Sequence, residues 1–154
     1  QLVVAGEVYD RRFLDEAEAL GVADHVTCLG RVPHDDMPDL IAAATVESHD
    51  LDFHGIGVAT QEVMAAGVPC VFAMARDQFP GVDFTRYPDL AMLDSNAPAV
   101  IAGAIVEILE NGPKRRQVGI DGQRLCAAVF SEGVVLDRLL SIYERALESS
   151  RLRS

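Results

Sequence analysis

Short apolar runs alternate with helical patterns along this chain, and that alternation constrains the fold more than any other feature. Runs rich in strand-forming residues predict β-strands at residues 2–6, 25–30, 45–48, 69–74 and 90–93. Apolar residues at helical spacing predict helices at residues 10–20, 35–44, 57–66, 98–110, 113–129 and 133–147. Residues 69–74 are apolar on both sides, which indicates an interior strand. The pattern predicts an α/β fold, a parallel sheet with helices on both faces.

The same pattern indicates where a ligand would lie. In open parallel sheets, ligands bind beyond the carboxyl ends of the strands. The loops that follow Ala5, Leu29, Ser48 and Met74 are therefore the candidate ligand-binding loops. Residues 75–89, which follow the predicted interior strand, carry prolines and charges and are predicted to be irregular.

One of these loops leads into the most informative motif, residues 54–69. Gly55 and Gly57 precede the predicted helix 57–66, and glycines let the backbone approach a ligand closely. The N-terminus of that helix offers N–H groups and a partial positive charge to a phosphate. Glu62, inside the helix, can only accept hydrogen bonds when ionised, which suits the hydroxyls of a sugar. These residues predict a nucleotide or nucleotide-sugar site.

Composition limits the partners. The 24 acidic and 13 basic residues give a net charge of −11, which disfavours binding to nucleic acid or to anionic lipid. No apolar run approaches the ~20 residues of a membrane span, so a cytoplasmic protein is expected. At 154 residues the chain has the size of a single domain, expected over residues 1–154. The three cysteines have no metal or redox spacing and sit among apolar neighbours, so we expect buried, reduced thiols at Cys28, Cys70 and Cys126.

Several segments, in this order, resemble the C-terminal, donor-binding half of a GT-B fold glycosyltransferase, closest to glycosyltransferase family 4. The resemblance is carried by the strand and glutamate at residues 2–7, by the run Gly-Val-Ala-Asp-His-Val-Thr-Cys-Leu-Gly-Arg-Val-Pro at 21–33, and by residues 62–69. It ends with Phe130, Ser131 and the amphipathic helix through Tyr143. It therefore covers nearly the whole chain and implies a Rossmann-like sheet.

The resemblance also implies roles for individual residues. Gly55, Ile56 and Gly57 match the turn that lies under the donor diphosphate, and Glu62 matches the glutamate that holds the nucleotide ribose. Gly30, Arg31 and Val32 match the segment beside the nucleobase. The resemblance implies no metal, and no catalytic residue is expected in this chain. No cofactor is expected either, because the nucleotide sugar is itself a substrate.

The chain departs from the family pattern in its site residues. His54 stands where the family has a second glutamate that contacts the donor sugar, and a histidine supplies no fixed negative charge near neutral pH. Arg76 opens the segment 76–90, which replaces the glycine-rich features after the family's fourth strand. Arg31 and Arg76 remain candidates for phosphate contacts.

The chain also starts one strand late. The resemblance implies a preceding strand and helix that carry an Arg and a Lys for the diphosphate, and a whole N-terminal acceptor domain, whereas this chain starts at Gln1. The missing strand would lie in the middle of the sheet and leave two unpaired edges. We therefore expect the strands at 2–5 and 45–48 to pair directly, or a second copy of the chain to fill the gap as a homodimer.

A metal site is an alternative interpretation of one polar loop. His49, Asp50, Asp52 and His54 are residue types that ligate transition metals, but they show none of the usual metal-binding motifs. Exposed side chains are the competing interpretation, and it is the one that the sequence favours.

Together these observations predict the donor-binding domain of a retaining glycosyltransferase that moves a sugar from a nucleotide sugar to a glycan, lipid or small acceptor, as in polysaccharide biosynthesis. Without the acceptor domain, and without the Arg and Lys that bind the diphosphate, this chain alone is expected to be inactive. Two alternatives remain: a non-catalytic α/β module that self-associates or binds a protein partner, and a GT-B epimerase.

Overall fold

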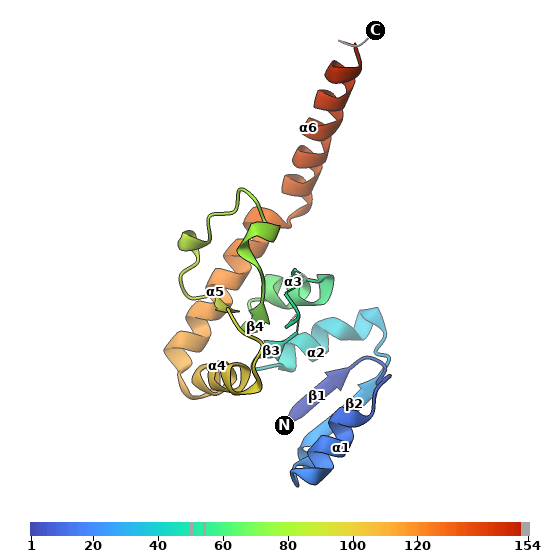
Figure 1. Cartoon of the computed structure of the whole chain (residues 1–154), viewed down its shortest axis with the longest axis vertical. Coiled ribbons are helices and arrows are strands. Elements are labelled where there is room, and N and C mark those ends of the chain that lie inside the picture. The colour runs from blue at the N-terminus through green and yellow to red at the C-terminus, as the bar shows by residue number, and fades with distance from the viewer. Residues whose placement is uncertain (50, 54, 152–154) are drawn as a thin grey trace. The chain divides into compact units, whose positions relative to one another are not determined.

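The computed structural model describes residues 1–49, 51–53 and 55–151 (Figure 1). Contacts within the chain divide it into two compact units, Gln1–Ile41 and Ala42–Ser154. Each unit has its own parallel sheet. The predicted α/β class, with parallel sheets flanked by helices, is confirmed.

The first unit is built around two parallel strands. The strands β1 (Leu2–Ala5) and β2 (Val26–Gly30) pair in register from Leu2 with Val26, and the helix α1 (Arg12–Ala19) connects them with the 3-10 turn η1 (Ala23–His25). A second 3-10 turn, η2 (His34–Asp36), leads into the helix α2 (Met37–Ala43). The segment predicted as one helix at 35–44 thus begins as a 3-10 turn.

The second unit holds a three-stranded sheet in the order β3-β4-β5. Its strands are β3 (Glu47–Ser48), β4 (Cys70–Ala73) and β5 (Ala91–Leu93), all parallel. The central strand β4 is buried along its whole length, which confirms the predicted interior strand. The helices of this unit are α3 (Val58–Ala65), α4 (Pro98–Glu110), α5 (Gly112–Val129) and α6 (Glu132–Arg151).

The core of the second unit forms where helices pack on β4. Val71 of β4, Ile108 of α4 and Val118 of α5 are almost completely buried and cluster together. Two 3-10 turns, η3 (Arg76–Gln78) and η4 (Phe84–Arg86), interrupt the segment between β4 and β5 that was predicted to be irregular. This core fixes β4 and, through it, the loops at its carboxyl end.

The predicted direct pairing of the strands at 2–5 and 45–48 would join residues of different units and stays a prediction. Among the described residues, β1 is hydrogen-bonded to β2 and β3 to β4, in two separate sheets. The strand β3 is also only two residues long, so it offers little backbone for a further ladder. Filling of the gap by a second copy remains a prediction.

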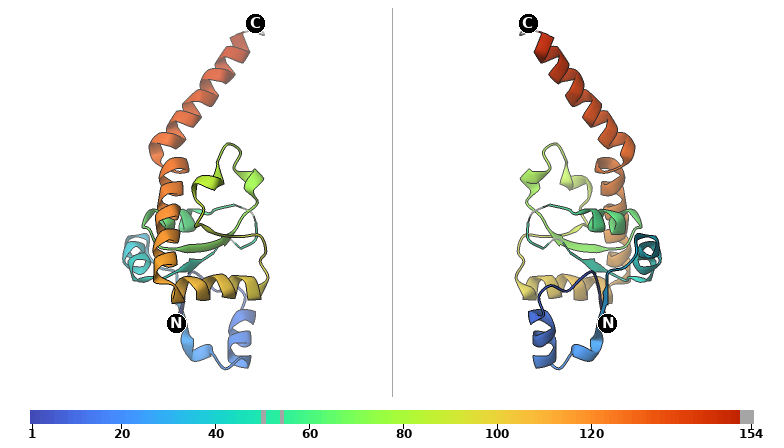
Figure 2. Two further views of the ribbon diagram at one scale, coloured as in Figure 1. Left: turned by 90° about the vertical axis from the view of Figure 1, so that its left-hand side faces the viewer. Right: turned by 90° about the vertical axis from the view of Figure 1, so that its right-hand side faces the viewer.

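The last helix does not pack along the core of its own unit. α6 continues beyond α5, away from the sheet β3-β4-β5 (Figure 2). The large apolar side chains of this amphipathic helix are exposed, at Leu136, Leu139, Leu140, Tyr143 and Leu147. Packing into the core of this chain is therefore excluded for them. No helix in the described part of the chain is long and apolar enough to cross a membrane.

The cysteines differ in burial, which corrects one expectation. All three are free thiols, but only Cys70 is buried, whereas Cys28 on β2 is exposed and Cys126 on α5 is half-buried. The error at Cys28 has a physical cause: its apolar neighbours in sequence form a strand of a two-stranded sheet, and the adjacent Leu29 is itself exposed.

Alkylation with iodoacetamide tests this order. We expect Cys28 to react first, Cys126 more slowly and Cys70 only on unfolding. Desolvation by burial raises the pKa of Cys126, so less of it is thiolate at neutral pH, and the thiolate is the reacting form. Mass spectrometry of peptides after timed quenching measures the three rates, and the urea-unfolded chain serves as the control. Equal rates in the folded chain would contradict the assigned burial.

Candidate functional site

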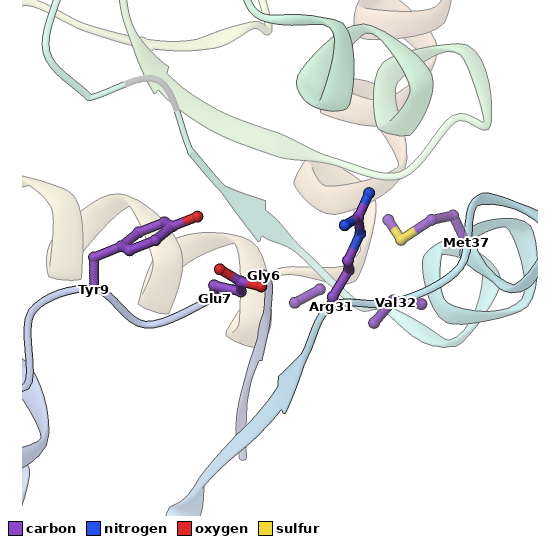
Figure 3. A pocket seen from close by; sticks show the side chains of 7 residues that line it. Gly6, Glu7, Tyr9, Arg31, Val32 and Met37 are labelled. Atoms are coloured by element: carbon purple, nitrogen blue, oxygen red, sulfur yellow. The ribbon is translucent and has the colours of Figure 1, made fainter.

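A pocket opens in the first unit at the carboxyl ends of β1 and β2 (Figure 3). Its volume is about 470 Å³, within the range of small-ligand sites. The residues that line it come from the loop after β1, from the loop after β2 and from the start of α2: Ala5, Gly6, Glu7, Tyr9, Arg31, Val32 and Met37. The pocket therefore lies where a parallel sheet is expected to bind ligands.

A backbone contact between the two loops shapes this pocket. The N–H of Gly6 donates to the carbonyl oxygen of Gly30 at 2.8 Å, just beyond the regular ladder. Gly30 has a φ of +65°, a conformation that glycine adopts without the strain of a side chain. After this turn, Arg31 and Val32 line the pocket and do not continue the strand.

Two predicted residues and two unpredicted ones meet in the pocket. Arg31 and Val32 were predicted from the sequence, and both line it. Glu7 and Tyr9 are not among the site residues that the sequence predicts, yet both line the pocket as well. The available signal was position, since both belong to the loop after Ala5, one of the four candidate loops.

The pocket combines a cation, a carboxylate and an aromatic ring. Figure 3 shows the Glu7 carboxylate, the Arg31 guanidinium and the Tyr9 ring around the same opening. The carboxylate accepts hydrogen bonds, the guanidinium donates them, and an aromatic ring or a guanidinium plane can stack on a flat heterocycle. Such a set suits a planar, polar group such as a nucleobase.

The second unit carries the glycine turn, residues 55–57, directly before α3. Gly55 has a φ of +116°, which a residue with a side chain adopts only with strain, and Ile56 is buried beneath the turn. Gly57 is the N-cap of α3 and supplies no side-chain cap to its first N–H groups. A helix N-terminus next to a glycine turn is suited to an anion such as phosphate.

Glu62 lies on the second turn of α3, downstream of the glycine turn, and its side chain is half-buried. The structure thus places Gly55, Ile56, Gly57 and Glu62 on one continuous turn and helix, whereas Arg31 and Val32 belong to the pocket of the other unit. His54, the remaining predicted site residue, lies outside the described residues.

The segment after β4 contributes Arg76, the other candidate for a phosphate contact. It starts η3 and its guanidinium carbon lies 6.0 Å from the centroid of the Phe84 ring. That stacking places its side chain against η4 within the same loop.

The structure does not support the alternative interpretation of the polar loop as a metal site. In the described ranges 1–49, 51–53 and 55–151, no three His, Cys, Asp or Glu side chains gather closely enough to hold a metal ion. Asp50 and His54 fall outside these ranges. His49 contacts Glu47, with 3.8 Å between its Nδ1 and the carboxylate.

Solved structures share this fold. Sucrose-phosphate synthase from Thermosynechococcus elongatus matches 96% of the chain with a TM-score of 0.75 at 20% identity, over 38% of its own chain. HepE from Anabaena, solved in complex with UDP, matches 93% with a TM-score of 0.75 at 18% identity, over 40% of its own chain.

Curated relatives match over most of this chain. A GDP-mannose-dependent alpha-(1-6)-phosphatidylinositol monomannoside mannosyltransferase of Mycobacterium tuberculosis is 27% identical over 82% of the chain and 34% of its own length. A D-inositol 3-phosphate glycosyltransferase of Salinispora arenicola is 29% identical over 93% of the chain and 32% of its own length. The chain thus spans about a third of these relatives. The model of the family described as glycosyl transferases group 1 matches residues 1–124, and the chain belongs to that family.

Proposed function

We propose that this chain is the nucleotide-sugar donor-binding part of a retaining glycosyltransferase. The observation that carries the proposal is the glycine turn at 55–57, which leads into the N-terminus of α3 with Glu62 one turn further along. The turn and helix N-terminus receive the diphosphate of the donor, and Glu62 accepts hydrogen bonds from the ribose hydroxyls.

The pocket of the first unit is, by itself, a candidate site for a flat ligand. Its volume and its lining by Arg31, Glu7 and Tyr9 suit a flat heterocycle with polar edges. The similar Mycobacterium tuberculosis enzyme depends on GDP-mannose, and HepE, which shares the fold, was solved with UDP, so guanine and uracil nucleotides are the probes of choice. A glycan, lipid or small molecule is the acceptor of the sugar.

Catalysis in this proposal rests on position and charge. Holding the donor in one geometry and stabilising the departing diphosphate lowers the barrier without a nucleophile from this chain. The chain by itself is therefore inactive in sugar transfer, and it binds donors weakly. The reason is that its residues include neither the family's acceptor domain nor the Arg and Lys that bind the diphosphate.

Calorimetric titration with UDP, GDP, UDP-glucose and GDP-mannose tests the proposal. We expect one of the two nucleotide families to bind, and Glu62→Ala to weaken that binding by about tenfold or more, since hydrogen bonds to a charged acceptor are worth about 1.5–3 kcal/mol. Glu107→Ala is the matched control, because Glu107 is an exposed glutamate on a helix, α4, that carries no site residue.

The proposal would be refuted by a chain that binds none of these nucleotides, or by Glu62→Ala binding as tightly as the unaltered chain. One observation favours the competing function, a self-associating or partner-binding module: the apolar side chains of α6 are exposed along its length. Sedimentation velocity at several concentrations, run beside the titrations, separates the two, because the module predicts association without nucleotide binding.

A further inference from the structure

Two glutamine side chains hold the segment that leads into α3. The Nε2 of Gln78 donates to the carbonyl oxygen of Phe53 at 2.6 Å, and the Nε2 of Gln61 donates to the carbonyl oxygen of Ile56 at 2.9 Å. Gln78 belongs to η3, which follows β4, whereas Gln61 belongs to α3 itself. The backbone next to the glycine turn is thus tied to a loop 25 residues further along the chain.

Phe53 is held in an unfavourable conformation. Its φ is +65°, and it is the only non-glycine residue among the described ones with a positive φ. A bulky side chain adopts this region only when surrounding contacts enforce it. A parallel bridge to Met74 and the hydrogen bond from Gln78 are the contacts that the structure provides. Strained backbone of this kind is concentrated at functional sites.

The same amide also covers the glycine turn. The Oε1 of Gln78 lies 3.7 Å from the position that a Cβ of Gly55 would occupy, so the side chain packs against that glycine while it bonds Phe53. On the far side, the bond from Gln61 fixes the peptide that joins Ile56 to Gly57. Because a peptide is planar, this also fixes the direction of the Gly57 N–H.

We infer that Gln78 is a positioning residue, whose amide holds the glycine turn in the conformation that receives the diphosphate of the donor. The inference rests on the proposed function and adds a residue that the family resemblance did not supply, since the segment 76–90 departs from the family pattern. Gln78 acts through the backbone of the turn and makes no contact with the ligand.

The substitution Gln78→Leu tests this role, because it keeps the size of the side chain and removes the amide. We expect about three- to tenfold weaker binding of the diphosphate, UDP or GDP, the range that one lost hydrogen bond of this type predicts. Binding of the matching monophosphate, UMP or GMP, changes less, so the ratio of the diphosphate dissociation constant to the monophosphate dissociation constant rises. A merely structural effect would weaken both ligands equally.

A matched control is available at the other end of the same helix. The Nε2 of Gln123 donates to the carbonyl oxygen of Ala65, the last residue of α3, at 3.0 Å. Gln123→Leu therefore removes the same kind of bond from an exposed glutamine, away from the glycine turn, and is expected to leave both dissociation constants unchanged.

The outcomes separate this inference from the function on which it rests. If the unaltered chain binds no diphosphate, the proposed function fails and this inference fails with it. If the unaltered chain binds and Gln78→Leu keeps the diphosphate-to-monophosphate ratio, this inference alone is overturned. Circular dichroism melting of each variant checks folding, and faster amide hydrogen exchange at residues 55–59 in Gln78→Leu alone is the second expected result.

Discussion

Replacing Gly119 with alanine is expected to destabilise the second unit by about 3 kcal/mol, at the upper end of the range for overpacked cores. A Cβ at this position would lie 2.2 Å from the carbonyl oxygen of Gly67 and 3.2 Å from its carbonyl carbon. The clash is with backbone, which moves only if α5 is displaced from the segment that connects α3 to β4. Urea unfolding followed by circular dichroism measures the loss.

Gly103→Ala is the matched control for this prediction. Gly103 is also a glycine inside a helix, α4, but a Cβ there would meet nothing within 4 Å. Alanine favours the helix over glycine by about 1 kcal/mol, so this variant should be as stable as the unaltered chain or slightly more so. Equal unfolding midpoints for Gly119→Ala and Gly103→Ala would show that α5 does not pack against Gly67 as closely as the structure indicates.

Removing the carboxylate of Asp121 is expected to cost about 2–3 kcal/mol, the size of a hydrogen bond to a charged group. Asp121 lies on α5 and its side chain is only 1% exposed. It accepts a hydrogen bond from the backbone N–H of Asp89 at 3.1 Å and another from the Nη1 of Arg124 at 2.8 Å. The carboxylate thus ties the segment before β5 to α5. Arg124 is 54% exposed, so water can solvate it once its partner is lost, which limits the cost.

Two variants make the Asp121 prediction specific. Asp121→Asn keeps one side-chain oxygen for the Asp89 N–H and should lose about half as much stability as Asp121→Ala. Asp137→Ala, at an exposed position of α6, should change the free energy of unfolding by less than about 0.5 kcal/mol. Thermal and urea unfolding of the three variants decide the case, and a loss of similar size in all three would mean that the burial of Asp121 contributes nothing.

Much of the fold was predictable because it depends on local patterns. The apolar run at 69–74 needed no other part of the chain to be recognised as an interior strand, and β4 is buried throughout. The site motif was also local, since Gly55, Gly57 and Glu62 lie within eight residues and form one turn and one helix. Patterns of this length predict the local structure correctly because their geometry is set by residues close in sequence.

Burial could not be predicted as reliably as secondary structure. Cys28, Leu139 and Leu140 sit in apolar stretches, yet all three are exposed, because burial requires a partner surface and not only an apolar side chain.

The sequence by itself determined the alternation of strands and helices, the family resemblance, and the turn and helix that carry Glu62. Only the tertiary structure showed that Gln78 reaches the backbone at Phe53, that Glu7 and Arg31 line one pocket, and that Gly119 is needed where α5 meets the backbone at Gly67. These are contacts between residues 24 to 52 positions apart in the chain. No local pattern encodes such contacts, because they depend on how separate elements pack.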